Sequence, residues 1–245
     1  MNFENSITWF ALAALIGGTY FYLTLLRKVD KFDPEPLHAL MYVLVIGGIG
    51  SVFFAILGNQ LLESFSRVSL SSLVKDEIGQ TNNLDIISVF LFSAFNEELC
   101  KYTFAFWLIR KSKHVNEPLD GLIYAITIGL GFSFFENITY FLQFGAEVVF
   151  ARMLLAVPLH MAAAAIWGVY LSTTLAKQKP LIFVNALPML LLASLFHGLW
   201  NASTTIMGGF FILLAPFVLR FCVKRVKVVI DELHLQSPFN PKRIQ

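Results

Sequence analysis

The sequence carries little charge for its length. Asp, Glu, Lys and Arg make up 14% of its 245 residues, hydrophobic residues make up 57%, and the mean hydropathy is +0.69. A water-soluble domain has roughly a quarter charged residues, so this composition argues against a soluble enzyme and favours a chain whose surface faces lipid. The net charge of +2 is too small for a nucleic-acid binder, and we expect no nucleic-acid partner.

Several chemical motifs are also absent. The two cysteines, Cys100 and Cys222, lie in apolar runs, which argues against a disulfide framework or a thiolate zinc cage and leaves them as packing residues. The sequence has no HExxH zinc motif, no glycine-rich phosphate loop and no serine in a nucleophile motif. A hydrolytic site must therefore be sought among individual side chains.

Long apolar stretches are abundant. A bilayer core about 30 Å thick requires about 20 mostly apolar helical residues. Seven stretches meet this requirement, at 7–26, 39–62, 84–109, 122–144, 153–176, 181–202 and 205–223. We predict an all-α, polytopic membrane bundle of about seven helices in the cell membrane, forming a single domain over residues 1–245.

The basic residues are distributed unevenly between the predicted loops. Segments 27–37, 110–119 and 177–180 and the C-terminal segment hold 14 Lys and Arg residues, whereas the alternate loops hold three. The positive-inside rule then predicts an N-terminus outside the cytoplasm and a C-terminus inside it. Residues 224–245 are predicted to be a basic cytoplasmic tail that meets anionic headgroups, and run 69–73 a small amphipathic element.

A few ionisable residues lie inside the predicted spans. They are Glu97, Glu98 and Lys101 in the third span, Glu136 in the fourth, His160 in the fifth and His197 in the sixth. An ionised group at the bilayer centre costs about 2.5–3.5 kcal/mol on insertion scales. These side chains must therefore pair, bind protons or face a water-filled cavity.

Helical spacing indicates how the groups pair. Glu97 and Lys101 are four residues apart, the favourable order for an ion pair on one face, and Glu98 is three residues from Lys101. His197 and Asn201 share a face by the same spacing. A structural Glu97–Lys101 salt bridge without catalytic meaning remains an alternative.

The predicted depths agree with one another. At 1.5 Å per residue, Glu136, His160 and His197 lie roughly 8–12 Å below the outer surface, and Glu97 lies roughly 20 Å below it, or less if its helix begins nearer Ser88. Pro158 weakens the backbone ladder beside His160 and can admit water there. We therefore expect groups from four helices to meet around one wet pocket in the outer half of the membrane.

Carboxylates, imidazoles and an amide together permit two kinds of hydrolysis. In one, a Glu activates water and His and Asn side chains stabilise the oxyanion. In the other, His160, His197 and a Glu hold a zinc-type ion and a second Glu acts as base. A proton-coupled transporter and a catalytically silent membrane scaffold are the alternatives from other classes.

Four segments resemble motifs of the PrsW family of intramembrane proteases. Residues 97–101 resemble its EExxK motif, 132–136 its FxxxE motif, and 158–160 and 197–201 its third and fourth motifs. The resemblance runs from about residue 85 to 203. Related CAAX prenyl endopeptidases and bacteriocin-immunity proteases carry His where this chain has Glu136, which favours PrsW.

The resemblance implies an endopeptidase that cuts membrane-anchored proteins, in some members an anti-sigma factor at its extracytoplasmic side. It implies either a divalent metal such as zinc, with His160 and His197 as ligands, or no cofactor. On the metal-free scheme Glu97 activates water, and Glu98 or Glu136 orients His160.

The remaining roles are also expectations from the resemblance. His197 and Asn201 hold the oxyanion, and Lys101 gives electrostatic support. The substrate's identity and the oligomeric state are left open.

Overall fold

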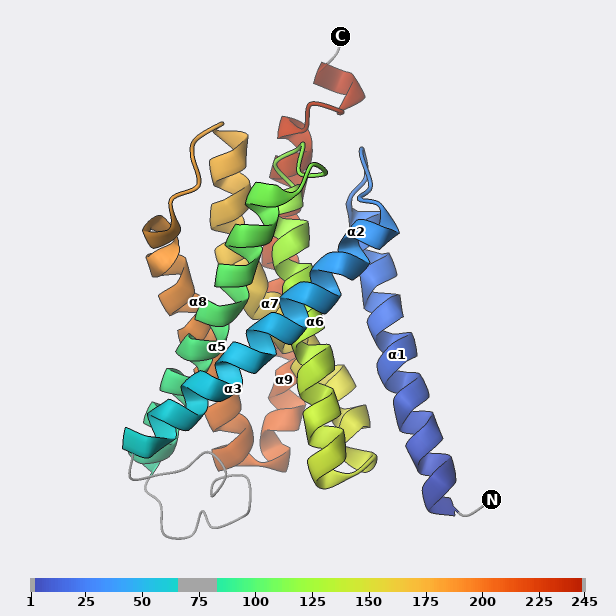
Figure 1. Ribbon diagram of the computed structural model, residues 1–245, viewed down its shortest axis with the longest axis vertical. Coiled ribbons are helices and arrows are strands. Elements are labelled where there is room, and N and C mark those ends of the chain that lie inside the picture. The colour runs from blue at the N-terminus through green and yellow to red at the C-terminus, as the bar shows by residue number, and fades with distance from the viewer. Residues whose placement is uncertain (1–2, 66–82, 244–245) are drawn as a thin grey trace.

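The computed structural model describes residues 3–65 and 83–243, and all regular secondary structure in these ranges is helical (Figure 1). The predicted all-α fold is therefore confirmed. The long helices are α1 (Phe3–Val29), α3 (Gly48–Phe65), α5 (Asn83–Lys111), α6 (Asp120–Phe144), α7 (Glu147–Ala176), α8 (Leu187–Met207) and α9 (Gly209–Gln236). The short elements are α2 (Leu37–Tyr42), a π-helical turn η1 (Val43–Gly47), and two 3-10 turns, η3 (Phe183–Ala186) and η4 (Pro241–Arg243). The element predicted at 69–73 lies outside the described residues.

Five segments of the described chain are long and apolar enough to cross a membrane. They are Ser6–Val29, Leu37–Ser64, Asp120–Phe144, Glu147–Ala176 and Phe183–Met207. α5 contains the predicted span 84–109, and α9 contains the predicted span 205–223 from residue 209 on, because residues 205–207 belong to α8 and Gly208 makes the turn. Neither helix is among the five, because charged residues interrupt their apolar runs. The count of seven crossings and the orientation stay predictions.

Large apolar side chains cover the outside of the bundle. Phe10 and Leu154 are each 70% exposed and Phe217 is 73% exposed. In water such a surface would drive association, whereas a bilayer solvates it. The low charge of the sequence thus has its structural counterpart in a lipid-facing exterior.

The helices run alternately up and down the bundle. Figure 1 shows the α1–α2, α5–α6 and α7–α8 connections and the C-terminus at one end, which is the upper end in this view. These are the segments in which the sequence concentrates Lys and Arg. At the opposite end, Gly145 and Gly208 have φ angles of +88° and +53° and make the tight turns after α6 and α8.

α6 lies at the centre of the bundle and is buried without a break from Asp120 to Ser133. Its approach to α7 depends on Gly129, where a Cβ atom would lie 2.6 Å from the carbonyl oxygen of His160. On α8, a Cβ at Gly198 would lie 2.9 Å from the Cα of Leu91 on α5. These two glycines therefore allow the helices that carry His160 and His197 to pack closely.

The C-terminal segment is more ordered than a tail. α9 continues thirteen residues beyond the predicted end of its span, to Gln236. Val226, Val229, Ile230 and Leu233 recur at helical spacing and pack on the main apolar core. The basic residues of this segment thus belong to an amphipathic helix whose apolar face covers the bundle.

Candidate active site

Side chains from four helices meet within the bundle. α5 supplies Glu97, Glu98 and Lys101, α6 supplies Glu136, α7 supplies His160 and α8 supplies His197. Glu98, Lys101 and His197 are fully buried, and His160 is 2% exposed. We call these six residues the Glu–His cluster. The sequence placed them in one layer, and the structure brings them together.

Lys101 lies at the centre of the cluster. Its Nζ is 2.7 Å from Oε1 of Glu98 and 3.0 Å from Nδ1 of His160, and it lies 3.9 Å from the centroid of the Phe132 ring. The expected ion pair between Glu97 and Lys101 is wrong, because the ammonium pairs with Glu98 on α5 itself and contacts His160 on α7. Spacing along one helix could not decide between the two carboxylates.

The hydrogen-bond partners of His160 define which of its ring nitrogens carries the proton. Lys101 donates to Nδ1, so the ring proton lies on Nε2 and is donated to Oε2 of Glu136 at 2.9 Å. Glu136 thereby orients His160, as one of the two expected alternatives had it. The other, Glu98, accepts a hydrogen bond from Nδ1 of His197 at 2.9 Å instead.

Two buried atoms of the cluster face each other without a hydrogen bond. With its proton on Nδ1, His197 carries a lone pair on Nε2, which lies 3.8 Å from Oε2 of Glu97. Neither atom has a hydrogen-bond partner among the described residues. The other oxygen of Glu97 accepts a hydrogen bond from Ser93 at 3.1 Å. Buried acceptors of this kind are normally satisfied, so the pair marks a place for a third group.

The cluster has its exposed side at Glu136. Arg152, in the first turns of α7, donates Nε–H to Oδ1 of Asn137 at 2.6 Å. Its Nη2 donates to Oε2 of Glu136. The side chains of Arg152 and Glu136 are 16% and 19% exposed, against 0% for Glu98 and Lys101. Arg152 and Glu136 are therefore more accessible than the Glu98–Lys101 pair.

Three contributors were missed by sequence reasoning. Arg152 was counted as a loop charge, Trp167 donates its indole N–H to Oε2 of Glu98 at 2.9 Å, and Ser93 binds Glu97. Trp167 is seven residues after His160, and Ser93 four before Glu97, so helical spacing gave a signal for both. Arg152 is found only once α6 and α7 are paired.

Asn201 does not join the cluster. It lies half-buried one turn beyond His197 on α8. In the described part of the chain no hydrogen bond links its amide to a cluster residue, and only its backbone carbonyl accepts one, from Thr204. The i,i+4 spacing gave the correct face but not a contact.

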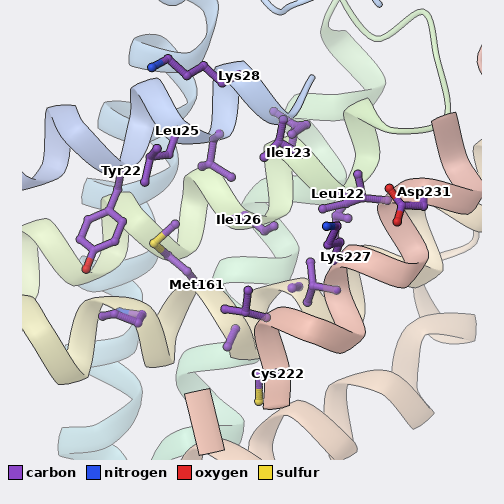
Figure 2. A pocket seen from close by; sticks show the side chains of 18 of the residues that line it. Tyr22, Leu25, Lys28, Leu122, Ile123, Ile126, Met161, Cys222, Lys227 and Asp231 are labelled. Carbon is purple, nitrogen blue, oxygen red and sulfur yellow. The ribbon is translucent and has the colours of Figure 1, made fainter. Parts of the chain in front are cut away.

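An apolar groove lies on the other side of α7. Figure 2 shows it between α1, α6, α7 and α9, with Leu25, Ile126 and Met161 on its walls. The groove has a volume of about 570 Å³ and includes Pro158 in its lining. Pro158 thus contributes to this groove, whereas His160 points to the Glu–His cluster on the opposite side.

The charges of the cluster do not cancel when all its carboxylates are ionised. Glu98 is paired with Lys101, and Glu136 with Arg152. Glu97 has no cation within ion-pair distance among the described residues unless His197, at 3.8 Å, is protonated. Glu97 is therefore the carboxylate that is left to take up a proton or contact a cation.

Comparison with known proteins identifies the family. Residues 35–224 match the PrsW family of intramembrane metalloproteases. The chain belongs to this family. It is 29% identical over 205 residues to Protease PrsW of Bacillus subtilis (strain 168), which covers 82% of this chain and 83% of the relative. It is 27% identical over 184 residues to Protease PrsW of Geobacillus kaustophilus (strain HTA426), covering 75% and 72%.

A further relative is Protease PrsW of Clostridioides difficile (strain 630), which is 27% identical over 180 residues and covers 70% of this chain and 71% of the relative. No solved structure matches the chain. As a PrsW-family member, the protein is a multi-pass intramembrane endopeptidase of the cell membrane.

The family description implies a metal ion, and the donor atoms fit one. One ligand atom each of Glu97, His160 and His197 lie within 4.8 Å of one another. The oxygen of Glu97 and Nε2 of His197 have no other partner. His160 would complete three protein ligands, the number typical of catalytic zinc, by releasing Lys101 or Glu136. The expected ligand set was two histidines and one unspecified Glu. Glu97, rather than Glu98 or Glu136, is the carboxylate that fits this set.

Proposed function

We propose that the Glu–His cluster is the peptidase centre and that Glu97 is the general base. The observation that carries the proposal is the facing pair of unpartnered acceptors, Oε2 of Glu97 and Nε2 of His197, 3.8 Å apart. A water molecule can donate one proton to each of them. Its lone pair is then directed away from both, toward an incoming peptide carbonyl.

The reaction follows from these positions. The water oxygen attacks the carbonyl carbon while Glu97 takes one water proton. The tetrahedral intermediate collapses as the C–N bond breaks, and Glu97 returns that proton to the amine nitrogen. A zinc-type ion would instead be held by Glu97, His160 and His197 and would supply Lewis acidity to a water molecule. Glu97 would then be a ligand, and a second carboxylate of the cluster would act as the base.

Oxyanion stabilisation requires a different residue from the ones expected. Nε2 of His197 has no proton in this tautomer, and the amide of Asn201 makes no hydrogen bond to the cluster among the described residues. We assign this role to Arg152, whose guanidinium lies beside Glu136 on the exposed side. A cation near a developing oxyanion stabilises the transition state more than the substrate.

We propose a membrane-anchored protein as substrate, cut near the outer face of the bilayer, as an anti-sigma factor would be. The support is the common depth of Glu136, His160 and His197 in the predicted orientation. The buried position of the cluster requires an unwound peptide segment, because a helical backbone keeps its carbonyls in internal hydrogen bonds.

The test uses purified protein in detergent with a single-span anti-sigma factor as substrate. Glu97→Gln and His197→Ala should each lower the cleavage rate by roughly 10²–10⁴-fold. Glu147→Gln, which neutralises an exposed Glu at the start of α7, is the matched control. Full activity of either cluster variant would remove that residue from the mechanism.

Metal dependence is decided on the same preparation. Metal content and cleavage are measured before and after treatment with a strong chelator, and zinc is then restored. Loss and recovery of activity support the metal-assisted scheme. Unchanged activity in metal-free protein leaves the scheme in which Glu97 and His197 act without an ion.

A further inference from the structure

A second group of buried acids lies at the upper end of the bundle in Figure 1, away from the Glu–His cluster. It comprises Asp30 and Glu35 from the α1–α2 connection, Glu117 from the α5–α6 connection, and Asp120 at the start of α6. Each is 3% exposed or less. We call these four residues the end cluster. The sixteen-residue separation of Asp120 and Glu136 on α6 corresponds to about 24 Å.

Three of these carboxylates share one hydrogen-bonding pattern. Oδ2 of Asp30 accepts from the backbone of Glu35 at 2.8 Å, and Oδ2 of Asp120 accepts from the backbones of Asn116 and Glu117, both at 2.8 Å. Glu117 accepts from the Ser237 hydroxyl through Oε2. The second oxygen of each of the three is buried and accepts no hydrogen bond from an N–H or hydroxyl donor of the described residues.

The three carboxylates also converge. One oxygen each of Asp30, Glu117 and Asp120 lie within 4.8 Å of one another. One oxygen of each carboxylate is thus held by a hydrogen bond, and the three remaining oxygens lie close to one another. Carboxylates separated by so little repel strongly in a buried site.

Glu35 provides an independent observation. It is not one of the three convergent acids, it is 2% exposed, and neither of its carboxylate oxygens has a hydrogen-bond partner. Burial, and then repulsion from Asp120 and Asp30, raise the pKa of Glu35 to about 8, so its side chain lies in the field of the end cluster. Two buried acceptors on one residue without a partner are uncommon.

No basic side chain compensates the end cluster. Arg27 is the near cation, but it donates to the backbone carbonyl of Glu35 at 3.1 Å and not to a carboxylate. In the described ranges, no Lys, Arg or His forms an ion pair with any of the four acids. Buried charges are normally paired or coordinate metals.

We propose that the end cluster binds a divalent cation of the Mg²⁺ or Ca²⁺ class. The ligands are the unpartnered, convergent oxygens of Asp30, Glu117 and Asp120, and the Glu35 carboxylate adds negative charge close to them. The donor set is all oxygen, without a His nitrogen or Cys sulfur, and hard cations prefer such a set. The site therefore differs in chemistry from the Glu–His cluster, whose His nitrogens suit a zinc-type ion.

The bound ion has a structural consequence. The four acids come from two connections, and Ser237, which follows α9, binds Glu117. His234 of α9 also contacts the carbonyl of Val29 at 3.0 Å. An ion in the end cluster thus ties α1, α6 and the end of α9 together, and its binding should raise the stability of the whole bundle.

The experiment uses the full chain in detergent, freed of metal by a chelator and then titrated separately with MgCl₂ and CaCl₂. Calorimetry should show saturable binding of at least one of the two ions. The unfolding temperature should rise by about 5–10 °C at a hundred times the dissociation constant. The test is independent of peptidase activity, so it stands if the catalytic proposal fails.

Glu35→Gln is the informative variant, because the Glu35 carboxylate makes no hydrogen bond that the substitution would break. It removes a negative charge from beside the ion and should weaken binding by roughly tenfold. Glu232→Gln, at an exposed acid on α9, changes the net charge equally and should bind as the wild type does. Absence of saturable binding by both ions to the wild-type protein overturns the proposal, as does undiminished binding by Glu35→Gln.

Discussion

The two buried acidic groups of this protein handle charge in different ways. The Glu–His cluster places Lys101 against Glu98 and Arg152 against Glu136. The end cluster holds four carboxylates with no cationic side chain in ion-pair contact among the described residues. In the Glu–His cluster only Glu97 lacks a Lys or Arg partner. In the end cluster all four acids lack one. A centre for proton transfer requires one reactive group held by compensated neighbours, and a cation site requires several uncompensated ones.

The largest effect should come from making the Glu–His cluster resemble the end cluster. Lys101→Met removes the ammonium that binds Glu98 and His160. The loss should destabilise the protein by about 3–5 kcal/mol, because it leaves a buried carboxylate unpaired. Thermal unfolding in detergent measures it. Adding Glu98→Gln should recover much of the stability but no activity, and a double variant as unstable as the single one would contradict this account.

A smaller effect should follow from separating the helices that carry the cluster. Gly129→Ala places a methyl group 2.6 Å from the His160 carbonyl oxygen, which should cost about 1–3 kcal/mol and also lower the cleavage rate by moving His160. The control is Gly17→Ala, because a Cβ there meets no atom within 4 Å. That substitution should be neutral or slightly stabilising. Equal effects at the two glycines would show that the close α6–α7 contact is not required.

Ser237→Ala tests the connection between the end cluster and α9. It removes the hydrogen bond to Oε2 of Glu117 and should destabilise metal-loaded protein by about 1 kcal/mol. Unfolding is followed with saturating Mg²⁺ or Ca²⁺. Ser203→Ala, at a half-buried hydroxyl on α8, provides the comparison, and a loss at Ser203 as large as that at Ser237 would remove the connection.

The smallest expected effect is a change in the free energy of unfolding whose sign differs between the two clusters. Asp30→Asn keeps an oxygen for the Glu35 N–H but removes one uncompensated charge. In metal-free protein the substitution should leave stability within about 0.5 kcal/mol of wild type or raise it, because it relieves repulsion between carboxylates. Calcium or magnesium should then stabilise the variant less than the wild type. A large loss in metal-free protein would mean that the Asp30 charge is compensated after all.

Much of this architecture could be predicted from local patterns. Apolar runs gave the helices, because lipid accepts only segments whose backbone groups are bonded internally. The rarity of charge in those runs made Glu97, Glu98, Glu136, His160 and His197 conspicuous. The rise per residue placed Glu136, His160 and His197 at a common depth and left Glu97 deeper. The family resemblance, carried by short motifs around the same residues, agrees with the match over residues 35–224.

Contacts between helices could not be predicted in the same way. Helical spacing placed Lys101 within reach of both Glu97 and Glu98, and only the neighbouring Phe132 and His160 direct it to Glu98. Asn201 had the correct face, yet its amide makes no hydrogen bond to the cluster in the described chain. The end cluster was not predicted at all, since its acids lie in connections where charge is ordinary and their burial arises from packing.

The sequence by itself determined that the chain is a helical membrane protein with ionisable groups at one depth, because hydropathy and helical rise are properties of each segment alone. Only the tertiary structure decided which carboxylate is compensated. Pairing depends on how α5, α6, α7 and α8 are rotated about their axes, and that rotation is set by side-chain packing between segments far apart in the chain.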